Sequence, residues 1–162
     1  MSMKLKIKQF FGPNRQYAVA GASNNPSKFG YKILNWYLQH DLSAIPINPR
    51  EHEILGQSVI SNISEIIKAI DSKTNLNDYN ISKVDGLSIS FLTPPSITVQ
   101  TLKEISQVEN YQNVIKGLWF QPGSYDQEVL DEAEKIGEFG KVIYQDECIL
   151  VRGEEGMISA NL

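Results

Sequence analysis

The residues best placed to do chemistry form a short turn, Gly21-Ala22-Ser23, between an apolar run at 17–20 and a helical pattern at 27–40. A buried strand that turns tightly into a helix leaves backbone N–H groups unpaired, beside the positive end of the helix dipole. Together these groups form an anion site suited to phosphate, and Gly21 lets the backbone approach a ligand closely. The alternative is a plain strand-to-helix connection, in which Gly and Ser serve only the turn and the cap.

The residues after the second apolar run indicate which nucleotide such a site would bind. A dinucleotide-binding domain usually carries an acidic residue there to hold the adenosine ribose. Here the residues are Asn48, Pro49 and Arg50, and no second glycine of a G-x-G-x-x-G pattern appears before Gly30, so ordinary NAD is disfavoured. The guanidinium of Arg50 suits a ribose phosphate, which favours coenzyme A and, less well, NADP. The alternative for Arg50 is a solvated surface residue beside Glu51.

No complete catalytic constellation is recognisable, so the sequence leaves open whether the chain is an enzyme and favours a non-catalytic role. His40 and His52 are the only histidines, and neither lies in a catalytic loop. There is no G-x-S-x-G elbow and no Cys/His cluster with the spacing of metal ligands, so we expect no serine hydrolase and no metal.

The single cysteine, Cys148, follows the last apolar run beside Asp146 and Glu147. The nearby carboxylates disfavour the thiolate that nucleophilic or redox chemistry needs, so a buried structural cysteine is the favoured reading. The alternative is a mixed disulfide between Cys148 and coenzyme A.

Apolar runs and helical patterns alternate along the chain, which predicts an α/β fold with about five parallel strands and helices on both faces, a Rossmann-like doubly wound sheet in three layers. We read Ser96 and Ser124 as the caps of the last two helices. The expected strands are 17–20, 43–47, 84–91, 115–120 and 141–144. The expected helices are 27–40, 63–70, 96–108 and 125–136.

In such a sheet the ligand lies outside the carboxyl ends of the strands, at the topological switch point. That rule brings turn residues from distant parts of the chain to one edge. They are Gly21–Ser23, Asn48–Arg50, Thr93–Pro95, Gln121–Gly123 and 146–148.

The 162 residues fit a single domain, 1–162, and the composition excludes several classes of partner. The net charge is −4 with scattered basic residues, which argues against nucleic acid, and no apolar run is long enough to span a membrane. One cysteine is compatible with a reducing cytoplasm. A protein partner or a homo-oligomer stays possible.

Three segments lie outside the alternating pattern. Residues 1–15 read as a short lead-in helix with Leu5, Ile7 and the Phe10-Phe11 pair packed onto the domain. The polar, Asn-rich residues 71–83 read as a surface insert, and residues 153–162 as a carboxyl-terminal tail.

Three motifs in register resemble those of the small stand-alone CoA-binding proteins, which are Rossmann-like domains similar to the CoA-binding part of the succinyl-CoA ligase alpha subunit. The motifs are Val19-Ala-Gly-Ala-Ser-Asn-Asn-Pro-Ser, Ile45-Pro-Ile-Asn-Pro-Arg50 with Ile54-Leu-Gly56, and Leu118-Trp-Phe-Gln-Pro-Gly123. Asp146-Glu-Cys148 also looks like that family's carboxyl-terminal signature. The resemblance runs from about residue 10 to 152 and implies a CoA or acyl-CoA ligand more strongly than an activity.

The resemblance implies contacts only where the motifs match. Phosphates would meet Gly21, Ala22 and Ser23, with Lys28 as a further candidate or a solvated lysine. The adenosine end would be flanked by Asn48, Pro49 and Arg50, with Thr93 and Pro94 lining the pocket beside them. Gln121 and Gly123 would border the pantetheine side. The related ligases use a phosphorylated histidine in a further domain, for which this chain is too short.

Three functions therefore compete. The first is a cytoplasmic module that binds CoA or a short acyl-CoA as a sensor, carrier or subunit. The second is an NADP-dependent oxidoreductase, disfavoured by the glycine pattern and by the lack of a catalytic Tyr-Lys or His pair. The third is an interaction protein with an unused pocket.

Overall fold

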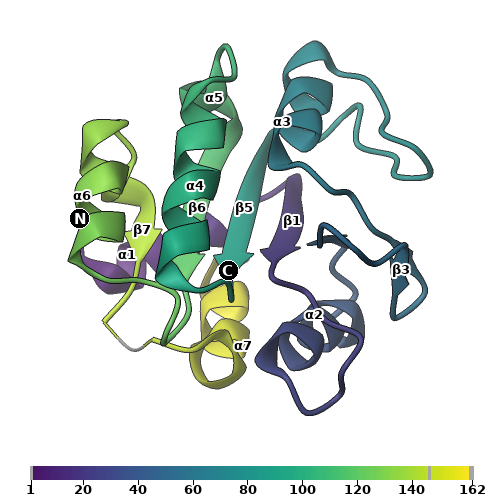
Figure 1. The fold of residues 1–162 in the computed structure, drawn as a ribbon, viewed down its shortest axis with the longest axis horizontal. Coiled ribbons are helices and arrows are strands. Elements are labelled where there is room, and N and C mark those ends of the chain that lie inside the picture. Colours follow the sequence, from purple (N-terminus) through teal and green to yellow (C-terminus); the bar gives the residue numbers. More distant parts are fainter. Residues whose placement is uncertain (1, 146, 161–162) are drawn as a thin grey trace.

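A computed structural model describes residues 2–145 and 147–160 and has a five-stranded parallel sheet at its centre (Figure 1). The strand order is β2-β1-β5-β6-β7, so the chain reverses direction across the sheet between β1 and β5, which defines the switch point. A separate antiparallel hairpin joins β3 (Glu53–Ile54) to β4 (Gln57–Ser58). The strands of the main sheet are β1 Arg15–Ala20, β2 Ala44–Ile47, β5 Gly86–Phe91, β6 Ile115–Phe120 and β7 Val142–Ile143.

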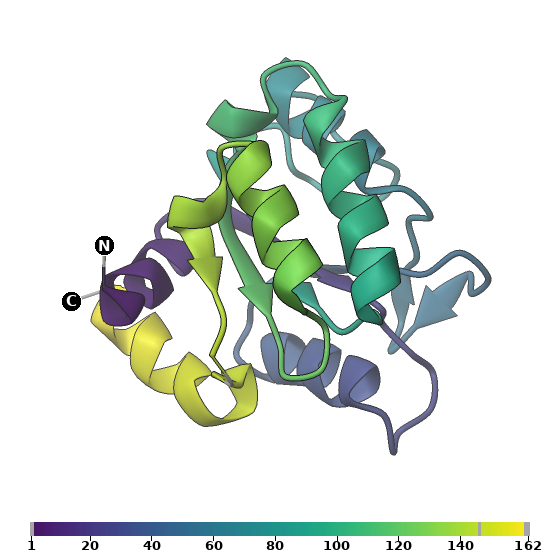
Figure 2. The ribbon, with the colours of Figure 1, turned by 60° about the vertical axis from the view of Figure 1, so that its left-hand side comes forward.

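Helices cover both faces of this sheet, which confirms the predicted Rossmann-like three-layer architecture (Figures 1 and 2). Helices α3, α4 and α6 share one apolar core with one face, and α1, α2 and α7 share a second core with the other. Figure 2 shows α1 and α7 side by side. The helices are α1 Met3–Phe10, α2 Phe29–Gln39, α3 Ile63–Ser72, α4 Pro95–Ser106, α5 Tyr111–Val114, α6 Gln127–Lys135 and α7 Ile149–Ala160, with the short 3-10 helix η1 at Phe139–Lys141.

The central strand β5 is buried on both faces, and its polar side chains are paired. Ser88 donates a hydrogen bond to the carbonyl oxygen of Phe10 at 2.8 Å. The hydroxyl groups of Ser90 and Tyr37 are hydrogen-bonded at 2.8 Å. Because a buried hydroxyl without a partner destabilises a core, these bonds let serine alternate with apolar residues in β5 and attach α1 and α2 to the sheet.

Two predicted helix caps are wrong. Ser96 lies inside α4, because Pro95 occupies the first turn, where its fixed φ suits a helix start and its missing N–H costs nothing. Ser124 does not cap α6 either; the carboxylate of Asp126 accepts the hydrogen bond from the Val129 N–H at 3.0 Å.

The segments outside the alternating pattern are more ordered than the sequence indicated. In the lead-in segment, Ile7, Phe10 and the C-cap residue Phe11 are buried as expected, but Leu5 is 54% exposed, which corrects its predicted packing role. The insert carries two side chains, Tyr79 and Ile81, into the core beside α3 and β5. The expected tail is helical from Gly153 to Ala160 and forms the larger part of α7.

Among the described residues, no helix has both the length and the apolar character needed to cross a lipid bilayer.

Candidate functional site

The turn after β1 is packed so closely that it requires glycine twice. Gly21 has a φ of +89°, and a Cβ there would lie 3.0 Å from the backbone of both Leu92 and Thr93, in the segment that follows β5. On the other side, a Cβ on Gly30 would overlap the carbonyl oxygen of Gly21. The amino end of α2 therefore lies directly against the switch point.

Gly30 was noted in the sequence only as a departure from the dinucleotide fingerprint, so its role was missed. The signal was present, since the last glycine of that fingerprint serves close packing of the helix on the strand. Here the same packing is reached nine residues after Gly21.

The two helices that follow the switch-point strands begin without a side-chain cap. The N-caps are Lys28 for α2 and Pro94 for α4, and neither side chain provides a hydrogen bond to the first turn. Their carbonyl oxygens accept hydrogen bonds only from the N–H groups at the end of that turn and just beyond it, those of Tyr31 at 3.1 Å and Ile97 at 2.9 Å among them. By contrast, α1, α3 and α6 are capped by the side chains of Ser2, Asn62 and Asp126. The N–H groups of Phe29 and Gly30 in α2 and of Ser96 in α4 have no partner among the described residues, so they are available to an anion at the carboxyl edge of the sheet.

Asn48 joins the loop after β2 to the loop after β1. Its amide nitrogen donates to the carbonyl oxygen of Ala22 at 2.9 Å, and its oxygen accepts from the N–H groups of Arg50 at 2.8 Å and Glu51 at 3.1 Å. Three of its hydrogen-bonding positions thus shape the site, and one N–H remains for a ribose or an adenine edge.

The loop between Gly21 and α2 is held by its own polar side chains. Ser23 accepts a hydrogen bond from the N–H of Asn25 at 3.0 Å, which leaves its hydroxyl proton to donate. Asn24 donates to the carboxylate of Glu51 at 2.8 Å and to the carbonyl oxygen of Glu53 at 3.1 Å. The segment that leads into the hairpin, which the sequence analysis missed, therefore holds the loop between Gly21 and α2.

An open cleft of about 620 Å³, part of it solvent, lies on the α4 side of the switch point. We call it the α4 cleft. Apolar side chains and three hydroxyl groups line it, with one carboxylate. Its residues are Ala20, Gly21, Ile47, Pro49, Ser61, Ile63, Thr93, Ile97, Thr101 and Glu104.

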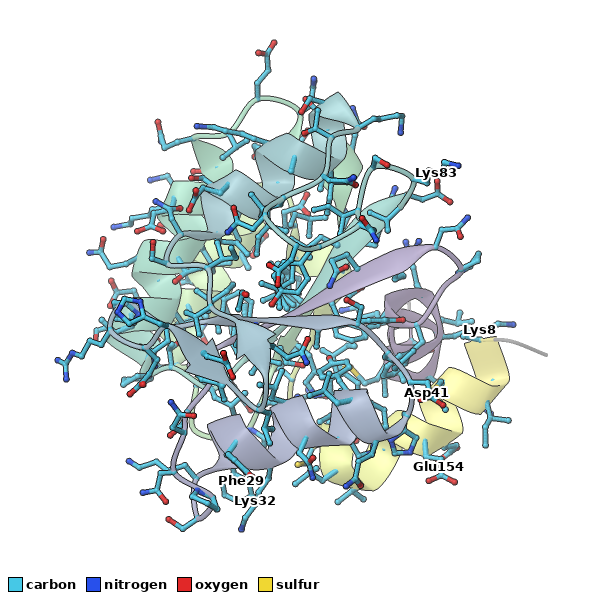
Figure 3. The ribbon with its side chains drawn as sticks, turned by 90° about the vertical axis from the view of Figure 1, so that its right-hand side faces the viewer. Lys8, Phe29, Lys32, Asp41, Lys83 and Glu154 are labelled. Carbon is cyan, nitrogen blue, oxygen red and sulfur yellow. The ribbon has the colours of Figure 1, made fainter. Side chains whose placement is uncertain are left out.

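A smaller pocket of about 250 Å³, part of it open solvent, lies on the α2 side of the sheet, and we call it the α2 pocket. Phe29 forms its outer wall; this side chain is 58% exposed, and the Lys32 ammonium lies 5.3 Å from its ring centroid (Figure 3). The lining is Phe29, Ile33, Leu92, Gln121, Pro122 and Cys148.

Cys148 is partly exposed in this pocket, so the expectation of a buried structural cysteine is wrong. The segment that carries it is attached to β6, since the indole N–H of Trp119 donates to the carbonyl oxygen of Glu147 at 2.7 Å. That anchor turns the residue before α7 toward the pocket and not into the core. Asp146, the first residue of the predicted signature, lies outside the described residues.

The structure brings four of the eleven predicted site residues into the lining of these two spaces. Gly21, Pro49 and Thr93 line the α4 cleft, and Gln121 lines the α2 pocket. The others line neither: Ala22 is buried, Ser23 and Asn48 are half-buried, and Lys28, Arg50, Pro94 and Gly123 are exposed. Gly123, with a φ of +92°, serves the turn after β6, in which the N–H of Ser124 bonds to the carbonyl oxygen of Gln121 at 3.0 Å.

Sequence reasoning missed the contribution of α4 to the cleft. Ile97, Thr101 and Glu104 recur at intervals of four and three residues, which places them on one face of a helix. That spacing was visible, but nothing in it showed that the face turns toward the switch point.

A model of the CoA binding domain family matches residues 15–154. An acetate–CoA ligase (ADP-forming) II alpha subunit from Pyrococcus furiosus is 36% identical over 63 residues, 38% of this chain and 14% of that protein. A trans-feruloyl-CoA synthase from an unknown prokaryotic organism is 27% identical over 141 residues, 83% of this chain and 17% of that protein. The chain thus spans less than a fifth of the length of these two relatives.

A solved structure of similar size shares the fold. A conserved hypothetical protein from Pyrococcus furiosus is 31% identical with a TM-score of 0.64, over 85% of this chain and 98% of that one. Because the family model covers most of the sequence, from β1 into α7, this chain belongs to the CoA-binding-domain family.

Proposed function

We propose that this protein binds coenzyme A or a short acyl-CoA across the switch point, as a sensor, carrier or subunit module that performs no reaction by itself. In this arrangement the adenosine end occupies the α4 cleft, the pyrophosphate lies at Gly21 and the amino end of α2, and the pantetheine arm extends toward the α2 pocket.

The observation that carries this proposal is the relation between two consecutive residues. Leu92 lines the α2 pocket, and Thr93 lines the α4 cleft, so the segment after β5 separates the two spaces by one residue. Between them lie the required glycine turn and an uncapped helix end. A ligand with an adenosine end, a central pyrophosphate and a long flexible arm matches this order of cleft, anion site and pocket.

The chemistry of each part supports the same ligand. The cleft offers hydroxyl groups and Glu104 to a ribose, and the aliphatic side chains of Ile47, Ile63 and Ile97 to an adenine. Ser23 and Lys28 lie beside the α2 terminus as further partners for phosphate, and Arg50 is exposed next to the Asn48 turn, free to reach a ribose phosphate. The pocket is mostly apolar, which suits a methylene-rich arm.

Calorimetry with CoA, dephospho-CoA, NAD and NADP tests the proposal. Dephospho-CoA lacks only the ribose phosphate, so Arg50→Ala should weaken CoA about tenfold and leave dephospho-CoA unchanged, since about 1.4 kcal/mol corresponds to one contact of this kind. Lys83→Ala is the matched control, because Lys83 is an exposed cation at the other end of the molecule from the amino end of α2 (Figure 3).

The other outcomes identify the competing functions. Binding of NADP without CoA would replace the proposal with an oxidoreductase. No binding of any of the four ligands would leave an interaction protein with an unused pocket.

A further inference from the structure

The α2 pocket contains a buried amide donor that is not satisfied within the described part of the chain. Gln121 is 1% exposed, and its oxygen accepts a hydrogen bond from the N–H of Ile149 at 3.1 Å. Its amide nitrogen has no partner there. A buried donor left unpaired destabilises a fold, so a native protein that retains one at a pocket wall points to an acceptor supplied from outside.

A thiol lines the same pocket. Cys148 is the single cysteine of the sequence, so any disulfide it forms joins it to another molecule. Its position is defined on both sides: Trp119 bonds the carbonyl oxygen of Glu147 at 2.7 Å, and Gln121 bonds the N–H of Ile149. The thiol therefore sits at a fixed place beside the unpaired amide.

The carboxylate next to this thiol is paired. Both oxygens of Glu147 accept hydrogen bonds from one guanidinium nitrogen of Arg152, at 2.8 and 2.9 Å. The sequence argument against thiol chemistry was the charge of the adjacent acids, and this ion pair offsets the charge of Glu147.

We propose that Cys148 is a thiol–disulfide exchange site for the pantetheine arm of the ligand, an inference that rests on the proposed function because the nucleotide end delivers the arm to this pocket. The Gln121 amide donates to an amide carbonyl of the arm, and Phe29, Ile33 and Leu92 surround its methylene groups. The chain is then captured covalently by CoA disulfide, the oxidised dimer of the ligand.

The exchange needs no oxidant or reductant other than CoA disulfide itself. The Cys148 thiol releases its proton to solvent, and its sulfur attacks one sulfur of CoA disulfide. The disulfide bond of the reagent breaks as the bond to Cys148 forms. One CoA leaves as a thiolate and takes a proton from solvent, so the disulfide itself is the oxidant and a free thiol reverses the reaction.

The test is the rate at which the purified full chain gains the mass of one CoA unit on incubation with CoA disulfide, against glutathione disulfide at the same concentration. Binding of the nucleotide end makes the exchange effectively intramolecular, with an effective concentration of about a millimolar, so we expect CoA disulfide to react about tenfold faster or more at micromolar concentration. Adenosine 3′,5′-bisphosphate, which lacks the arm, should slow the CoA reaction only.

A variant that fills the α2 pocket distinguishes a reaction that needs the pocket from one that needs only an accessible Cys148 thiol. Leu92→Phe should suppress the CoA adduct while iodoacetamide still alkylates the protein, and Leu5→Phe, on the exposed side of α1, should behave as the unchanged chain does. Equal rates with the two disulfides would overturn the inference. If CoA binds in calorimetry under reducing conditions but incubation with CoA disulfide without a reductant gives no adduct, the inference is overturned and the proposed function stands. Failure of CoA to bind in that calorimetry would overturn the proposed function itself.

Discussion

The carbonyl oxygen of Gly21 occupies the space that a side chain on Gly30 would need. This contact joins the turn after β1 to the first turn of α2, and it sets the distance between the helix terminus and the switch point.

Gly30→Ala should therefore lower the free energy of unfolding by about 1–3 kcal/mol, because an added methyl group forces the helix away from the strand. Urea denaturation followed by circular dichroism measures this change. Gly140→Ala is the control, since a Cβ there meets no other atom within 4 Å, and we expect a change within about 0.5 kcal/mol. Equal effects of the two substitutions would show that the Gly21–Gly30 contact is not tight.

Asn48 should act mainly by holding two loops together. Asn48→Ala removes the bonds to Ala22, Arg50 and Glu51, and we expect a loss of about 1–3 kcal/mol of stability. Asn48→Asp keeps the acceptor for the two N–H groups and loses only the donor, so its loss should be smaller. Chemical denaturation of both variants measures the difference, and an alanine variant as stable as the parent would rule out this role.

Variants that fill the α4 cleft or the α2 pocket should weaken the binding of different ligands. Thr101→Phe occupies the α4 cleft, so we expect it to weaken both CoA and adenosine 3′,5′-bisphosphate about tenfold, a change of about 1.4 kcal/mol. Leu92→Phe occupies the α2 pocket and should weaken CoA alone. Gln100→Phe, on the exposed side of α4, is the control. Titration calorimetry with the two ligands decides, and the reverse pattern would mean that the arm lies in the α4 cleft.

Stability should depend on pH through Glu138. Burial raises the pKa of this carboxyl group above its ordinary value, although the Lys141 ammonium at 2.8 Å lowers it in part. The folded chain therefore keeps the Glu138 proton to a higher pH than the unfolded chain does. As pH rises from the unfolded carboxyl pKa of about 4.3 to the raised folded pKa, wild-type stability should fall relative to Glu138→Gln.

Urea denaturation of wild type and Glu138→Gln between about pH 4 and about pH 7 measures this dependence. Glu134→Gln, which removes an exposed carboxylate from α6, should track the wild type over the same range. A stability difference between Glu138→Gln and wild type that stays constant with pH would contradict the raised pKa.

Much of the fold was predictable because strands of a parallel sheet buried on both faces read as apolar runs. The strand at 115–120 was predicted with its observed bounds, and the other four were located within a few residues. The position of the site at the carboxyl edge of the sheet followed from the predicted topology alone. The residues that line the α2 pocket and the α4 cleft could not be predicted in this way. Phe29 and Ile97, for example, come from helices on opposite faces of the sheet, and which face of each helix turns toward the switch point depends on tertiary packing.

Helix α7 was missed for a related reason. Gly153 and Gly156 lower its intrinsic helix propensity, so the segment read as a tail. In the structure a Cβ on Gly153 would meet the ring of Trp36, and one on Gly156 would meet Ile7. The glycines permit close packing of α7 on α2 and α1, and that packing outweighs propensity.

Because of these contacts, the fluorescence of the protein's own tryptophans should report on its carboxyl-terminal segment. The sequence has two tryptophans, and both touch this region: Trp119 donates its indole proton to the carbonyl oxygen of Glu147, and Trp36 lies against Gly153. Any event at Cys148 that shifts the start of α7 must alter the surroundings of an indole. Intrinsic fluorescence can therefore follow the occupation of the α2 pocket in real time without any attached label.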